Sequence, residues 1–150
     1  MLDPKIIEAE KRWAQKVVTN AKSILLQNKK IATGALYNSV RYVVNPQGSI
    51  QFIFAEQGKW VQSGRRRNSR FPPPEPISNW IRAKGIQGRD RRGRFISRKS
   101  LTFLISRGIA RDGIKPLPFM SMAISQSKKE LAAELKREIT RAMVARLKQR

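Results

Sequence analysis

The 150-residue sequence contains no cysteine and no histidine. Without them the chain cannot form disulfides, thiolate or imidazole zinc sites, or a histidine general base. Acidic residues are scarce as well, with 10 Asp and Glu against 32 Lys and Arg. The carboxylates are scattered along the sequence and show no paired-acid or metal-ligand spacing. We therefore expect no enzymatic activity, no cofactor and no metal site.

Long hydrophobic runs are also missing. No stretch approaches the roughly 18 apolar residues that a membrane-spanning helix requires. The first residues, MLDPKIIEAEKRW, are amphipathic and contain three acidic residues, which is not typical of a signal peptide. Hydrophobic residues nevertheless make up 40% of the chain, so we expect a soluble, intracellular protein that folds as a single domain over residues 1–150.

Positive charge is abundant, with a net charge of +22, and it is concentrated in the middle of the chain. Residues 59–115 contain 16 Lys and Arg but only 3 Asp and Glu. A chain of this charge requires an acidic partner, which is nucleic acid, an anionic membrane surface or an acidic protein. No helix-turn-helix, zinc-finger or RNA-recognition signature is present, so base-specific reading is not expected.

Two loops, residues 63–71 and 87–96, carry eight of the twelve arginines of this middle segment. Guanidinium groups bind phosphate bidentately, so these loops are candidates for contact with a nucleic-acid backbone. The alternatives are ion pairs with a neighbouring subunit or simple solvation. The second loop is rich in charge and glycine, and we expect it to be disordered in the isolated protein. The candidate residues are Arg65, Arg66, Arg67, Arg70, Arg89, Arg91, Arg92 and Arg94.

The hydrophobic periodicity predicts an α+β fold. Residues 1–30 have the three- and four-residue spacing of a long helix, opened by Asp3 as N-cap. Two strand-like segments flank the turn signal NPQG and predict a β-hairpin with Phe52 and Phe54 on its buried side. The expected architecture is thus a small antiparallel sheet packed against a long N-terminal helix, short middle helices and a long C-terminal helix.

The second half of the chain contains the middle helices and the last helix. We interpret GKWVQSGRRRNSRFPPPEP as a long loop and PISNWIRAKG as a short helix with Trp80 in the core. Ser97 is expected to cap a further helix whose buried face includes Leu101 and Leu104. A basic amphipathic helix is predicted over residues 125–150, with an apolar ladder at every fourth position: Leu131, Leu135, Ile139, Met143 and Leu147.

Four motifs follow one another in a recognisable order: TGALYNSV at 33–40, WVQSGRR at 60–66, PPPEPISNWIRAKGI at 72–86 and LTFLISRGIARDGIKPLPFMSMAI at 101–124. This set resembles the tail-completion, or head–tail joining, family of tailed bacteriophages over roughly residues 33–124. The chain departs from the family pattern in QSGRR, where an acidic residue often precedes the glycine, and in its basic RDRRGRF segment.

The resemblance implies a structural virion protein without catalytic activity, located at the neck and assembled in the host cytoplasm. It implies a homo-oligomeric ring, commonly of six copies, with neighbouring neck, tail-terminator or tail-tube proteins as partners and no membrane. Genomic DNA would pass through the ring without sequence-specific contacts. The arginines would then face either the DNA channel or a ring interface. Trp60, Phe119 and Met120 are the candidate subunit-interface residues. The alternative interpretation is a free-standing, non-specific nucleic-acid-binding protein.

Overall fold

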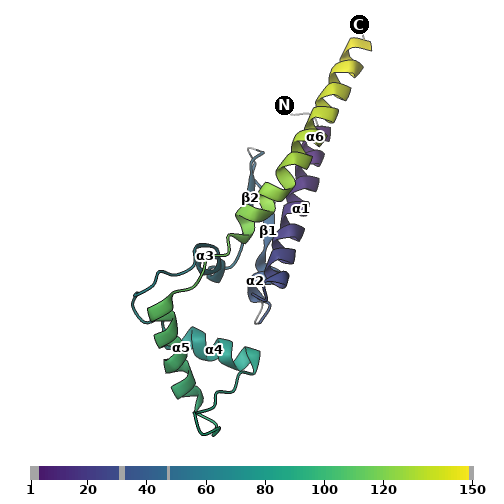
Figure 1. Cartoon of the computed structure of the whole chain (residues 1–150). Coiled ribbons are helices and arrows are strands. Elements are labelled where there is room, and N and C mark those ends of the chain that lie inside the picture. Colours follow the sequence, from purple (N-terminus) through teal and green to yellow (C-terminus); the bar gives the residue numbers. More distant parts are fainter. Residues whose placement is uncertain (1–3, 31–32, 47, 149–150) are drawn as a thin grey trace. The chain divides into compact units, whose positions relative to one another are not determined.

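A computed structural model describes residues 4–30, 33–46 and 48–148 (Figure 1). These residues form six helices and one two-stranded antiparallel sheet, which confirms the α+β class. The contacts of the chain group it into two compact units. The first unit comprises residues 1–29, 39–54 and 119–150, and the second comprises residues 30–38 and 55–118. The expected organisation as one domain stays a prediction.

Two long helices, α1 (Pro4–Gln27) and α6 (Phe119–Lys148), form the main part of the first unit. They lie side by side and antiparallel (Figure 1), because Arg12 pairs with Glu134 at 2.6 Å while Asn20 donates to the Ser127 hydroxyl at 2.9 Å. The predicted N-cap Asp3 lies outside the described residues. The buried face of α1 follows the predicted helical spacing, with Ala9, Ala14, Val17, Val18, Ala21, Ile24 and Leu25.

The predicted hairpin is confirmed as β1 (Arg41–Val44) and β2 (Ile50–Ile53), with Tyr42 opposite Phe52. Its turn is closed by the Gly48 amide, which donates to the Asn45 carbonyl at 2.8 Å. Phe52 contacts the Trp13 ring edge-on with centroids 5.9 Å apart. This contact supports the expected inward face of the sheet, packed against α1.

The structure corrects the predicted start of the last helix. Helix α6 begins at Phe119 rather than at residue 125, because Pro118 precedes it and proline favours a helix start. The residues that α6 buries come from its first three turns: Phe119, Met120, Ala123 and Ser127. Leu131 and Leu135 are half-buried, whereas Ile139, Met143 and Leu147 are exposed, the last at 73%. The predicted ladder therefore packs only at its beginning.

The second unit contains four short helices. Helix α2 (Ala35–Ser39) begins shortly after Thr33, whose hydroxyl accepts from the Ala35 amide at 3.3 Å. Helix α3 (Gln57–Ser63) occupies part of the segment that the sequence predicts as a loop, and this prediction was wrong. The element was missed because seven residues containing a glycine, without a side-chain cap, show no readable period.

Helices α4 (Pro74–Lys84) and α5 (Arg98–Asp112) are the longer pair of the second unit (Figure 1). Ile77 and Ile81 are buried as expected, but Trp80 is 41% exposed, so its predicted place in the core was wrong. The Ser97 cap of α5 is confirmed, since its hydroxyl accepts from the Ser100 amide. The buried face of α5 is also different from the prediction: its members are Thr102, Ser106 and Ala110, while Leu104 is exposed and Leu101 half-buried.

Candidate functional site

Two glycines that are far apart in sequence meet in the second unit. The amide of Arg65 donates to the Ile114 carbonyl, and the amide of Ile114 donates back to the Arg65 carbonyl, both at 2.9 Å. Gly64 and Gly113 precede these residues with φ of 68° and 73°. A Cβ on Gly64 would lie 2.4 Å from the Ile114 carbonyl oxygen, and one on Gly113 would lie 2.4 Å from the Arg65 carbonyl oxygen. Only glycine fits at these two positions, and we call this pairing the glycine clasp (Gly64–Arg65 with Gly113–Ile114).

The first basic loop continues from the glycine clasp along the end of α5. The Asn68 amide donates to the Arg111 carbonyl at 3.3 Å, and the Ser69 amide donates to the Ala110 carbonyl at 3.0 Å. The last carbonyls of a helix lack partners within the helix, so this loop acts as the cap of α5. The arginine loop is therefore an ordered part of the fold, held at a helix C-terminus whose partial negative charge suits its cations.

The four arginines of this loop have different environments. The Arg65 guanidinium donates to the Ser69 hydroxyl at 3.0 Å and to the Arg70 carbonyl at 2.5 Å, so it stabilises the loop itself. Arg66, Arg67 and Arg70 are exposed, and none of them has a salt bridge among the described residues.

One carboxylate borders the first basic loop at the end of α5. The Arg111 guanidinium, hydrogen-bonded to Asp112 at 2.7 and 2.8 Å, lowers the pKa of that carboxyl below its ordinary value, and the charge of Arg67 acts in the same direction. Asp112 therefore remains an anion at neutral pH, and its charge offsets part of the positive charge of the loop.

The second basic loop forms a closed turn, which contradicts its predicted disorder. Asp90 organises this turn: its Oδ1 accepts from the amides of Arg92 and Arg94, both at 2.9 Å, and its Oδ2 accepts from the Arg94 guanidinium at 3.0 Å. Arg89 lies over the Phe95 ring, 3.9 Å from its centroid, and donates to the Gly93 carbonyl. The turn thus uses Arg89 and Arg94 internally and presents Arg91 and Arg92 to solvent.

The hydrogen bonds from Arg94 and Arg92 lower the pKa of Asp90, with the Arg94 amide as the largest cause. The carboxylate that holds the turn together is therefore charged at neutral pH. Five of the eight candidate arginines remain as exposed side chains without a role inside the described fold: Arg66, Arg67, Arg70, Arg91 and Arg92.

Of the three candidate interface residues, one is exposed and two are buried in the core. Trp60 lies in α3, not at a strand end, and is 61% exposed, which keeps it as a candidate anchor. Phe119 and Met120 are buried in the first unit, and the Phe119 ring packs edge-on against Phe54 with centroids 5.3 Å apart. These two side chains belong to the core because α6 begins at Phe119, and this burial does not support their assignment to a subunit interface, which stays a prediction.

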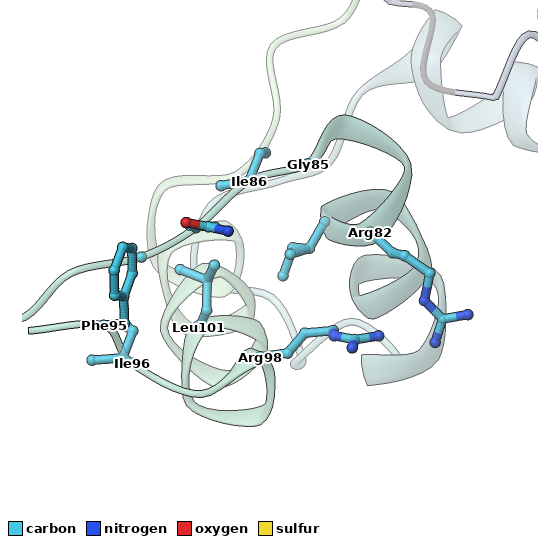
Figure 2. Close-up of a pocket in the computed structure, with 10 residues that line it drawn as sticks. Arg82, Gly85, Ile86, Phe95, Ile96, Arg98 and Leu101 are labelled. Carbon is cyan, nitrogen blue, oxygen red and sulfur yellow. The ribbon is translucent and has the colours of Figure 1, made fainter.

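Two neighbouring hollows beside α4 and α5 were not predicted from the sequence. The first, of about 410 Å³, is lined by both polar and apolar residues, and the apolar ones include Ile81, Ile86 and Leu101 (Figure 2). The second, of about 940 Å³, is lined by residues that include Phe71 and Phe103. Arg82 and Arg98 line both hollows. We call this surface the α4–α5 groove (the two hollows together with Arg82, Arg98 and Lys99).

A sequence signal for the α4–α5 groove did exist. Arg98 and Lys99 occupy the first turn of α5, which contains no acidic residue. Cations at this end of a helix oppose its dipole and are unfavourable for stability. A helix N-terminus attracts anions, and two basic side chains in the same turn strengthen this attraction. The two basic loops dominated the prediction because they contain more arginines.

Within the described parts of the chain, no three His, Cys, Asp or Glu residues are grouped closely enough to hold a metal ion. Among those same residues, no helix has both the length and the apolar character needed to cross a membrane. Comparisons with protein-family models, with curated proteins and with solved structures find no match to this chain.

Proposed function

We propose that this protein is a ring-forming structural component of the neck of a tailed phage, joining head and tail around the DNA channel. One observation carries the proposal beyond the sequence resemblance. The motifs WVQSGRR and IARDGIKPLPF, separated by more than thirty residues, are joined by the glycine clasp. Both glycines have backbone conformations and close contacts that exclude a side chain. Two of the motifs that carry the resemblance are thus in direct backbone contact, and this contact supports a fold related to that of the family.

The charge distribution is compatible with this role. A basic surface along a DNA channel attracts phosphates without reading bases, because the attraction depends on charge and counterion release. The five exposed arginines are held on two ordered loops, so little backbone conformational entropy is lost when they meet an anionic surface. The anionic surface in our proposal is the genomic DNA, and the acidic face of an adjoining ring is the competing assignment.

The test is the location of the protein in phage particles. Virions purified from cells that carry the gene are expected to contain the chain at fixed copy number, in a symmetric ring at the head–tail junction visible by electron cryomicroscopy. Deletion of the gene is expected to yield filled heads and free tails that do not join. Purified virions without the protein would refute the proposal.

The second candidate function, non-specific nucleic-acid binding by the free protein, is favoured by the same exposed arginines. It differs in the affinity that it requires. A free-standing binding protein holds duplex DNA at moderate salt and shows a steep salt dependence, whereas a neck component binds weakly outside the particle. Binding isotherms over a salt series, compared with the copy number in virions, distinguish the two functions.

A further inference from the structure

We propose that the α4–α5 groove binds an acidic peptide segment of another protein, in which a carboxylate side chain is flanked by apolar side chains. The site lies entirely within the second unit, so it requires no arrangement of the two units. The inference does not depend on the assignment to a phage neck, because it follows from the chemistry of the groove alone.

The arrangement of charge and apolar surface specifies this ligand. Arg82 comes from the last turn of α4 and Arg98 from the first turn of α5. Figure 2 shows both side chains extending toward the same side of the first hollow, away from Phe95. Since these two arginines line both hollows, a carboxylate bound between them would have apolar surface on either side. Arginine binds carboxylate bidentately, which fixes the position of the ligand.

Arg82, Arg98 and Lys99 form no salt bridge among the described residues. The first turn of α5 adds the partial positive charge of the helix dipole to Arg98 and Lys99. Glu75 also lines the second hollow and offsets part of this charge. The excess remains positive, so the groove is complementary to an anion.

The second hollow provides apolar surface and an unused hydrogen-bonding group. Phe71 and Phe103 are both exposed, and their rings stack with centroids 6.0 Å apart and an interplanar angle of 22°. The Ser106 side chain lines this hollow and is 4% exposed, yet its hydroxyl oxygen has no hydrogen-bond partner within the described chain. A buried hydroxyl without a partner is costly, and a peptide backbone in the hollow would supply one.

A peptide fits the groove better than the other anionic partners do. A nucleic-acid strand places a phosphate at every nucleotide and needs cations along its whole path, but here the cations gather between two hollows that also present apolar side chains such as Leu101 and Phe103. A second copy of this chain is a poor source of such a ligand, because it has only 10 Asp and Glu against 32 Lys and Arg. The occupant is therefore a segment of a different, acidic protein.

The test uses the full-length protein and a short fluorescein-labelled peptide with one aspartate between a leucine and a phenylalanine. The matched peptide has asparagine in place of the aspartate. Fluorescence anisotropy is expected to show binding that is about tenfold or more stronger for the aspartate peptide, as is reasonable for a bidentate charge-assisted pair. Equal affinity for the two peptides, or no binding by either, would overturn the proposal.

Two double variants identify the binding residues. The double variant Arg82→Gln with Arg98→Gln is expected to weaken binding of the aspartate peptide by about tenfold or more. The control, Arg107→Gln with Lys115→Gln, removes the same charge from exposed residues that line neither hollow, and it is expected to bind as the wild type does. Equal weakening by both variants would show that only net charge matters and would overturn the site.

Ser106→Ala provides a readout that a purely structural role does not produce. The variant is expected to melt at the same or a higher temperature, because it removes a buried hydroxyl without a partner. It is also expected to bind the aspartate peptide more weakly. Unchanged affinity would show that Ser106 does not contact the bound peptide. Displacement of the peptide by oligothymidylate in preference to an acidic competitor peptide would assign the groove to nucleic acid and overturn the proposal.

Discussion

Arg65 and Arg66 are adjacent in sequence and identical in chemistry, but the loop uses them differently. Arg65 donates two hydrogen bonds to its own loop, through Ser69 and the Arg70 carbonyl. Arg66 is exposed and has no salt bridge among the described residues. From sequence alone the two were equivalent, because nothing in a run of arginines indicates which guanidinium turns back onto the backbone.

Replacement of Arg65 is expected to affect the stability of the fold, whereas replacement of Arg66 is expected to affect DNA binding. Arg65→Ala should lower the free energy of unfolding by about 1–2 kcal/mol, since it removes two hydrogen bonds that order the loop. Arg66→Ala should change it by no more than about 0.5 kcal/mol, as is usual for an exposed side chain, while weakening DNA binding. Urea denaturation measures the first effect and a salt-dependent binding assay the second. Equal stability of the two variants would contradict the assigned role of Arg65.

The glycine clasp is expected to be sensitive to a single methyl group. Gly64→Ala should destabilise the protein by about 2 kcal/mol or more, because it forces both a left-handed backbone and a close contact with the Ile114 carbonyl. Gly108→Ala is the matched control: it lies inside α5 with open space around its Cβ position, and it should stabilise the helix by about 1 kcal/mol. Thermal melting distinguishes the two, and destabilisation of similar size in both would argue against the clasp.

At the scale of helices and strands, the sequence predicted those elements that carry their own local signals. Helix α1 has a strong apolar period, the hairpin has the NPQG turn, and α5 has the Ser97 cap. Helix α3 was missed because it is short and lacks a side-chain cap. The glycine clasp and the α4–α5 groove depend on contacts between distant segments, which periodicity and composition do not encode.

The Asp90 turn is expected to depend on pH in the acidic range. Because the folded turn lowers the pKa of Asp90, through the Arg94 amide first, the carboxylate form stabilises the turn. That contribution is complete above the ordinary aspartate pKa of about 3.9 and is lost as the pH falls through the lower folded value. Amide exchange at Arg94, followed by NMR, should accelerate over this range. Asp90→Asn retains an acceptor without the titration, so an equally pH-dependent variant would contradict this assignment.

At the scale of the whole chain, most of the positive charge belongs to one segment. Residues 59–115 hold half of the Lys and Arg but only 3 of the 10 acidic residues, and they lie in the second unit. The segment 55–118 leaves the first unit after Phe54 and returns to it at Phe119. The rings of Phe54 and Phe119 are in contact. Its two ends therefore start from neighbouring points of the first unit, as in an inserted domain.

Removal of this segment is expected to leave the first unit folded but to lower the affinity of the chain for DNA. A variant in which a short Gly/Ser linker replaces residues 55–118 should keep α1, the hairpin and α6 folded, because the linker has only to join Phe54 to Phe119. Circular dichroism and the fluorescence of Trp13, which contacts Phe52, measure this directly.

The same variant should lose most of its affinity for duplex DNA. If the exposed arginines bind the phosphates, the slope of log K against log salt should become shallower by about 0.9 for each phosphate that the variant no longer neutralises. A control in which Arg66, Arg67, Arg70, Arg91 and Arg92 are changed to Gln in the full chain should reproduce most of that change while keeping the second unit folded. A deletion variant that retains the wild-type slope would place the DNA-binding residues on α1 and α6 instead, and would refute the role assigned here to the two basic loops.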